Sequence, residues 1–232
     1  MTFEDALNYP RQGDDPWRTI LIGGVLGLLG FLVLPIFLVL GYFVRTLRAA
    51  IADEPEPPVF GDWEALFVDG LKAFVVGLVY FIIPIVVFAV SVGGIAISAI
   101  MTGDVGFGAI AGAMAGFSLS FVLALIAWYI VPAAITNAVH EGRIGAGFDF
   151  GTLRPFLLSG TYATAWLLAL GLMIVAGIVV GILNVIPPLG FVVGAFIDFY
   201  VGVAAFYLYG RAYAEAVSSE PAPEAPSGQP AA

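Results

Sequence analysis

The sequence predicts an all-α fold, a polytopic transmembrane helical bundle of about five spans. Hydrophobic residues make up 61% of the 232 residues and charged residues only 11%, whereas soluble globular chains have roughly 45–50% and 25%. A small domain keeps a large surface in contact with its solvent, so this much apolar surface cannot all be hidden from water. The apolar runs are solid, which excludes a β-barrel with its short segments of alternating polarity.

Four charge-free runs carry the expected spans: residues 19–44, 73–103, 105–139 and 156–197. Each is longer than the roughly 20 residues that a helix needs to cross about 30 Å of hydrocarbon. The last run is too long for one crossing, and Asn184-Val185-Ile186-Pro187-Pro188 in its middle is a strong helix breaker. We therefore expect spans over residues 19–44, 73–96, 108–132, 156–183 and 189–210.

The expected transmembrane domain, residues 19–214, lies between two polar ends. Residues 1–18 are acidic and lack the basic and apolar regions of a cleavable signal peptide. Residues 215–232 are rich in Pro, Ala, Ser and Glu, which predicts a disordered tail. The first apolar segment has early glycines and Pro35, so a bent helix is expected there. We favour a full crossing, and a re-entrant element is the alternative.

The connection before the second span contains an amphipathic pattern. Asp62 is suited to cap a helix N-terminus, and Trp63, Leu66, Phe67 and Leu71 recur at helical spacing after it. This pattern predicts a short interfacial helix that lies along the membrane surface and then bends into the span.

Arginine and lysine predict the orientation, because cytoplasmic loops are enriched in them. Connections 45–72 and 140–155 and the C-terminal tail are therefore expected in the cytoplasm. Full crossing of the first segment leaves Arg11 and Arg18 outside, whereas a re-entrant segment brings all eight cations inside. The six cations that share one side in either case are Arg45, Arg48, Lys72, Arg143, Arg154 and Arg211.

The polar surface is acidic, with a formal net charge of −9 and no cysteine. This balance favours a halophilic source and argues against nucleic acid as a partner; chance in a small set of polar residues is the alternative. Without cysteine there are no disulfides or thiolate metal sites. We expect no cofactor and no metal.

Asp198 is the most informative single residue, because it lies near the centre of the fifth span. A charged carboxylate at that depth costs on the order of 2.5–3.5 kcal/mol. Asp198 is either a proton or cation site or a neutral residue that hydrogen-bonds two helices together, and we favour the structural role. The expected partners are hydroxyl groups: Ser91, Ser98, Ser118, Ser120, Thr161, Tyr162 and Thr164.

Glycines recur four residues apart in several spans, a spacing that lets helix backbones approach closely. The steps are Gly23/Gly27, Gly108/Gly112/Gly116, Gly177/Gly181 and Gly190/Gly194. We interpret them as packing positions that also offer faces for a second copy or another membrane protein. Four aromatic residues flank the spans as interface anchors would: Trp17, Trp63, Tyr42 and Tyr213.

Enzyme motifs are absent from the sequence. The sole histidine, His140, lies in a polar connection, so no histidine is available at membrane depth to activate Ser118 as a nucleophile. Asp198 has no second in-span carboxylate, which an intramembrane aspartyl protease needs. Arg143 could join His140-Glu141 and Asp149 in a polar cluster, but we favour a solvated loop for these residues.

Several short stretches form a recognisable pattern. The most specific are Gly41-Tyr42-x-x-Arg45 and Phe67-x-Asp69-Gly70-Leu71-Lys72, and the others are Leu7-Asn8-Tyr9-Pro10, Asp14-Asp15-Pro16-Trp17, residues 20–24 and Asp62-Trp63. In these stretches the sequence resembles the archaeal membrane family known as domain of unknown function 4013, which is found largely in halophiles and methanogens. The resemblance extends to about Ala214 and implies a multi-span membrane protein without an assigned activity.

Together these features predict a multi-pass protein of the cell membrane with a non-enzymatic role as a scaffold, accessory subunit or membrane-organising component. The alternative is a small proton- or cation-coupled permease or channel that uses Asp198. A polar stripe converging on Asp198 would favour transport, and an isolated Asp198 would favour structure.

Overall fold

The computed structural model describes residues 2–13 and 15–218, and within them the fold is all-α, as predicted. Five helices are long and apolar enough to cross a membrane: α3, α4, α5, α7 and α8. The elements are α1 (Phe3–Asn8), η1 (Tyr9–Arg11), α2 (Pro16–Leu28), η2 (Leu29–Leu32), α3 (Leu34–Ile51), α4 (Trp63–Thr102), α5 (Phe107–His140), η3 (Ile144–Phe148), α6 (Phe150–Leu157), α7 (Gly160–Leu183) and α8 (Pro187–Ser218).

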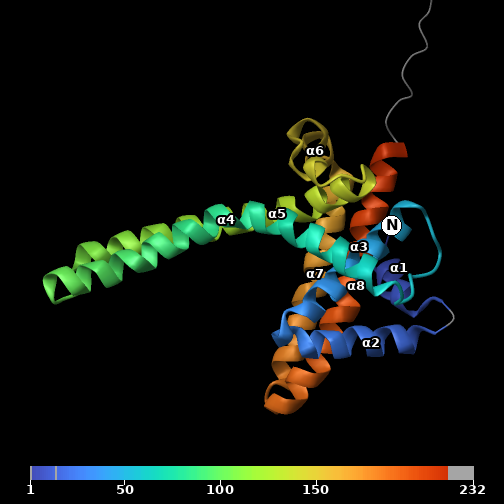
Figure 1. The fold of residues 1–232 in the computed structure, drawn as a ribbon, viewed down its shortest axis with the longest axis horizontal. Helices are drawn as coiled ribbons and strands as arrows, with labels where there is room; N and C mark the ends of the chain where they lie inside the picture. Colours follow the sequence, from blue (N-terminus) through green and yellow to red (C-terminus); the bar gives the residue numbers. More distant parts are fainter. Residues whose placement is uncertain (1, 14, 219–232) are drawn as a thin grey trace, which may run out of the picture.

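Two helical hairpins dominate the architecture, α4–α5 and α7–α8. Figure 1 shows the α4–α5 hairpin extending far from the rest of the molecule, while α7–α8 runs in a different direction. Helix α3 packs against both α4 and α8, and α6 and the C-terminal end of α8 lie near the place where the hairpins meet. The turns that close the hairpins, residues 103–106 and 184–186, therefore lie far apart.

The first apolar segment is divided rather than continuous. Helix α2 ends at Leu28, the chain makes a 3-10 turn over residues 29–32, and α3 begins at Leu34. Val33 at the break has a φ of 67°, an uncommon conformation for a β-branched residue. Pro35 follows in the first turn of α3, where a missing N–H costs nothing. The segment is bent, and its full crossing or re-entry stays a prediction.

The expected bend between an interfacial helix and the second span is absent, because α4 is one continuous helix over both. The Asp62 carboxylate caps it, accepting from the Ala65 N–H at 3.2 Å, as the sequence predicts. The helix then continues without interruption from Trp63 to Thr102 and passes through Pro84. Leu66 is fully buried, so packing against the protein holds these first turns in line with the span. The polar connection is correspondingly short, residues 52–62.

The second half of the chain follows the expected division more closely. Helices α7 and α8 are separated at residues 184–186, because Pro187 and Pro188 cannot continue a helix but fit the first turn of a new one. Helix α8 passes beyond Arg211 to Ser218. Residues 215–218 of the expected tail are thus helical, and residues 219–232 lie outside the described residues.

Burial is concentrated where the hairpins meet and is lost along the projecting hairpin. No residue from 85 to 119 is buried, and we call this segment the arm. In the most apolar 18-residue stretch of α5 only 6% of the residues are buried, against 44% in α3. The core of the described chain therefore lies at its charged end, and the arm presents apolar side chains in every direction.

Candidate functional site

The backbones of α3 and of the first turns of α4 lie in close contact, and two glycines permit it. A Cβ atom at Gly41 would overlap the carbonyl oxygen of Leu66, and one at Gly70 would overlap the carbonyl oxygen of Phe37. Any larger side chain would therefore push the two backbones apart. We call this region, residues 41–73, the junction.

Side chains of α3 hold the loop 52–62 in place. The Tyr42 hydroxyl donates to the carbonyl oxygen of Pro58 at 2.7 Å. The Arg45 guanidinium donates to the carbonyl oxygens of Gly61 at 2.6 Å and Asp62 at 3.0 Å. Tyr42 is fully buried, so it is a core residue and not the interface anchor that the sequence suggested. The same correction applies to Tyr213, which is 9% exposed, whereas Trp17 is 78% exposed.

The N-terminal segment closes over the same loop. The Tyr9 hydroxyl donates to the carbonyl oxygen of Glu56 at 3.1 Å, and its ring stacks on Tyr207 of α8 at 4.2 Å. Burial raises the pKa of Tyr9 well above its usual range, so its hydroxyl stays a hydrogen-bond donor. Arg211 of α8 also pairs with Asp53 of the loop. The motif residues quoted above thus serve to fix the junction.

Asp198 lies in a groove of about 430 Å³ between α2, α3, α7 and α8. The groove is lined by Gly23 and Gly27 of α2, by Phe43 of α3 and by Asn184 before α8. Asp198 is exposed rather than buried. Within the described residues no hydrogen bond or ion pair reaches its carboxylate, so the proposed interhelical hydrogen bond is not present.

The hydroxyl groups expected around Asp198 lie elsewhere. Ser120 reaches across to α4 and donates to the carbonyl oxygen of Pro84 at 2.7 Å. Tyr162 donates to the carbonyl oxygen of Tyr129. Ser91, Ser118 and Thr164 donate to carbonyl oxygens four residues earlier in their own helices. Asn184 is a second polar side chain that lines the groove. In the sequence it stands out only as part of a helix breaker, which gives no sign of this position.

A second polar cluster lies at the charged end of α5, around Asn137, and no motif in the sequence indicates it. Asn137 is 3% exposed, and its amide donates to the carbonyl oxygen of Ala146 at 2.8 Å and to the Thr152 hydroxyl at 2.9 Å. Its side-chain oxygen accepts from the Tyr213 hydroxyl at 3.3 Å. These bonds tie α5, η3, α6 and α8 together, which is a structural use of a buried amide.

The charged side chains of residues 140–149 are loosely paired and exposed. Arg143 lies 3.8 Å from Glu141 and 3.9 Å from Asp149, with its side chain 56% exposed. His140 stands apart, its ring 4.8 Å from that of Tyr213. Across the described part of the chain, no group of three His, Cys, Asp or Glu side chains is arranged to hold a metal ion.

The glycine steps separate into two kinds. Gly23 packs against Phe199, Gly194 against Val180, and Gly116 against Ser91. Gly27 and Gly190 also have close neighbours, Ala195 and Asn184. A Cβ atom would meet open space within 4 Å at the four remaining positions: Gly108, Gly112, Gly177 and Gly181. The prediction that glycines pack helices holds at these positions, including Gly116 between the two helices of the arm, while the four open positions lie on outward faces.

Comparison with known proteins identifies one family. The model described as "Protein of unknown function (DUF4013)" matches residues 26–185, more than half of the chain. The matched stretch contains the junction and the arm and ends before Asp198. No curated protein matches the chain, and no solved structure matches it.

Proposed function

Because the chain belongs to DUF4013, a family of unknown function, we propose its role from its own geometry: a non-enzymatic scaffold that organises membrane by associating with further copies of itself. The observation that carries this proposal is the arm, 35 consecutive residues without a buried side chain. The two helices of the arm contact each other, and their outward apolar surface is available for lipid and for another membrane protein.

The open glycines support self-association. Lipid offers no hydrophobic driving force between helices, so association depends on small residues that permit close backbone contact. Gly108 and Gly112 on the arm and Gly177 and Gly181 on α7 have no neighbour within 4 Å of a Cβ position. Both hairpins therefore carry a glycine face directed away from their own chain.

The length of the arm supports an effect on the bilayer. The apolar part of α4, residues 73–102, spans about 45 Å at 1.5 Å per residue, against about 30 Å of hydrocarbon. A helix longer than the hydrocarbon thickness either tilts or locally thickens the bilayer. The two hairpins also run in different directions (Figure 1), so aligning one with the membrane normal tilts the other.

The non-enzymatic part of the proposal rests on how the in-span hydroxyls are used. Ser91, Ser118, Ser120 and Thr164 each donate to a backbone carbonyl oxygen, so none is hydrogen-bonded to a base that would activate it. A serine or threonine nucleophile requires such a base.

Self-association is tested by counting subunits of the full chain in vesicles, using single-molecule photobleaching of a labelled terminus. We expect dimers or larger assemblies, which Gly112→Leu or Gly181→Leu converts towards monomers. Gly160→Leu is the matched control, because Gly160 is exposed and lies in open space at the first residue of α7. A wild-type chain that is monomeric at every density would overturn the proposal.

We also infer that the junction and residues 141–149 face the cytoplasm of a cell-membrane protein, from the cations that gather there. The chain lacks cysteine, so single-cysteine variants report without background. Gly61→Cys and Gly145→Cys should both resist an impermeant thiol reagent in intact cells and react after lysis. Labelling of one site alone in intact cells would contradict the five-span topology.

The acidic composition supports a halophilic, archaeal source. If this is correct, the unfolding temperature should rise with KCl concentration, whereas a chain from a low-salt source gains little.

A second candidate is a proton- or cation-coupled permease, favoured by the Asp198 groove alone. Vesicles with an internal pH-sensitive dye separate the two functions. Flux that is present in the wild type, absent in Asp198→Asn and retained in the Asp104→Asn control would replace the scaffold by the permease. No flux in any of the three leaves the scaffold proposal in place.

A further inference from the structure

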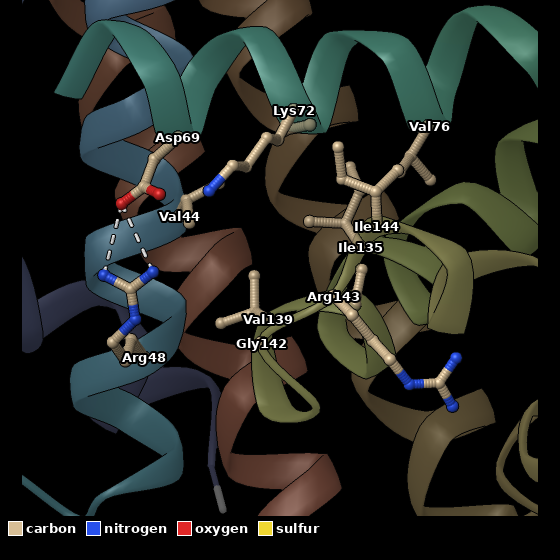
Figure 2. Close-up of a pocket in the computed structure, with 12 residues that line it drawn as sticks. Val44, Arg48, Asp69, Lys72, Val76, Ile135, Val139, Gly142, Arg143 and Ile144 are labelled. Atoms are coloured by element: carbon tan, nitrogen blue, oxygen red, sulfur yellow. Dashed lines mark hydrogen bonds and ion pairs between the residues drawn. The ribbon is translucent and has the colours of Figure 1, made fainter. Parts of the chain in front are cut away.

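A cavity of about 60 Å³ lies at the charged end of the molecule, between α3, α4, α5 and the loop after α5. Figure 2 shows Arg48, Lys72 and Arg143 around it, with Asp69 beside Arg48. A water requires only about 10–15 Å³ by the same measure, so a larger group fits. Three of the eight cations of a chain of net charge −9 line this one cavity.

The charged side chains at the cavity differ in whether they form an ion pair. Both terminal nitrogens of Arg48 donate to one carboxylate oxygen of Asp69 at 3.2 Å, which neutralises that carboxylate. Lys72, the sole lysine of the chain, has no hydrogen bond or ion pair with any described residue. Its amino group extends towards the Asp69 and Val44 side of the cavity, whereas the Arg143 guanidinium points away (Figure 2). Lys72 is thus an uncompensated cation at the cavity.

Aliphatic side chains form the rest of the wall: Val44, Val76, Ile135, Val139 and Ile144. Lys72 directly precedes the charge-free run of residues 73–103, which places it at the boundary between the polar end and the apolar part of α4. Next to it along α4, Leu71, Phe74, Val75 and Leu78 are exposed. A molecule with an anionic head and an apolar body can pair with the Lys72 cation and also cover the exposed apolar side chains of α4.

We propose that this cavity binds the phosphate group of an anionic lipid, with Lys72 as the principal contact. The phosphate accepts from the Lys72 ammonium and from the outer N–H groups of Arg48, and the acyl chains lie along the exposed apolar face of α4. Basic pockets between transmembrane helices bind anionic head groups by this chemistry. A soluble phosphate would use the same cations but would leave the neighbouring apolar face to other lipids.

The test measures binding to the full chain in detergent, by native mass spectrometry and by the unfolding temperature. The probes are dioleoyl phosphatidylglycerol, dioleoyl phosphatidylcholine as the zwitterionic comparison, and inorganic phosphate. Lys72→Gln should weaken phosphatidylglycerol binding about fivefold, the equivalent of about 1 kcal/mol for one cation near a membrane surface. Arg154→Gln is the matched control, an exposed cation on α6 away from the cavity.

Lys72 is exposed, so its variant should fold, which circular dichroism and gel filtration would establish. Arg48→Gln offers a second loss of charge at the cavity. Stabilisation by phosphatidylglycerol that depends on Lys72, with no effect of inorganic phosphate, supports the lipid site. Equal stabilisation by inorganic phosphate would overturn the lipid as occupant. Equal binding by Lys72→Gln, Arg48→Gln and the wild type would overturn the site itself.

Discussion

The two ends of α4 differ in burial and in how closely they pack against other helices. Leu66 in the junction is fully buried, whereas Ile100 in the arm is 83% exposed, although one continuous helix contains both. At the junction, Gly70 fits against a backbone carbonyl of α3, while Gly93 and Gly94 have open space around them. The same residue types therefore have different physical roles at the two ends.

This difference separates what specifies the fold from what the membrane supplies. The junction is fixed by close backbone contact and by hydrogen bonds to loop carbonyls, which tolerate little change. The arm needs only the intrahelical hydrogen bonds of two helices and an apolar surrounding, because lipid accepts almost any aliphatic side chain. Substitutions should be costly at the junction and nearly neutral in the arm.

The largest expected effect comes from a matched pair of glycine substitutions. Gly41→Ala places a methyl group against the Leu66 carbonyl oxygen, and overpacking of this kind costs about 3 kcal/mol. For a chain of this length that lowers the unfolding temperature by roughly 6–12 °C. Gly112→Ala enters open space and should leave the temperature unchanged or raise it slightly, because alanine favours the helix.

The measurement is thermal unfolding of the full chain in one detergent, followed by intrinsic fluorescence. Equal effects at Gly41 and Gly112 would remove the contrast between junction and arm. A rise in unfolding temperature for Gly41→Ala would show that α3 and α4 do not approach as closely as described.

A smaller effect is expected from Tyr42→Phe, which keeps the ring and removes the hydroxyl donor to Pro58. The loss of one such hydrogen bond costs about 1 kcal/mol, or about 2–4 °C. Tyr207→Phe is the control, because the Tyr207 hydroxyl has no hydrogen bond within the described residues. Hydrogen exchange should also speed up in loop 52–62 of Tyr42→Phe alone, and unchanged exchange there would show that Tyr42 does not hold the loop.

The all-α class and most helix positions follow from the sequence because they depend on local properties. Charge-free runs mark helices that must satisfy their own backbone in lipid, and the Pro187-Pro188 pair marks the start of α8. Asp62 indicates the N-terminus of α4, because its short side chain can accept a hydrogen bond from the first turn of the helix. Each of these signals is contained within a few neighbouring residues.

What the sequence did not predict depends on contacts between distant segments. Gly194 lies against Val180, whereas a Cβ atom at Gly108 would meet open space. The sequence cannot distinguish the two positions, because lipid and the protein interior are equally apolar. Tyr42 looks like an interface anchor in the sequence, because nothing near it in the chain indicates the distant acceptor that its burial requires, the carbonyl oxygen of Pro58. The grouping of Arg48, Lys72 and Arg143 around one cavity likewise depends on how α3, α4 and the loop after α5 are placed relative to one another.

The smallest expected effect on stability comes from Asp69→Asn, and it tests whether the Arg48–Asp69 pair serves stability or the cavity. The two side chains are 53% and 17% exposed, and pairs of this kind contribute about 0.2–1 kcal/mol. A double-mutant cycle with Arg48→Gln should give a coupling in this range. The coupling should fade as salt rises, because the Debye length falls from about 10 Å at 0.1 M to about 3 Å at 1 M.

Phosphatidylglycerol binding should change in the opposite direction to stability, because Asp69→Asn removes a negative charge from the cavity and releases Arg48 towards the phosphate. Tighter binding with a slightly lower unfolding temperature would assign the pair to the cavity. Weaker binding would show that Asp69 positions Arg48 for the ligand, and a loss of several kcal/mol would make the pair part of the junction.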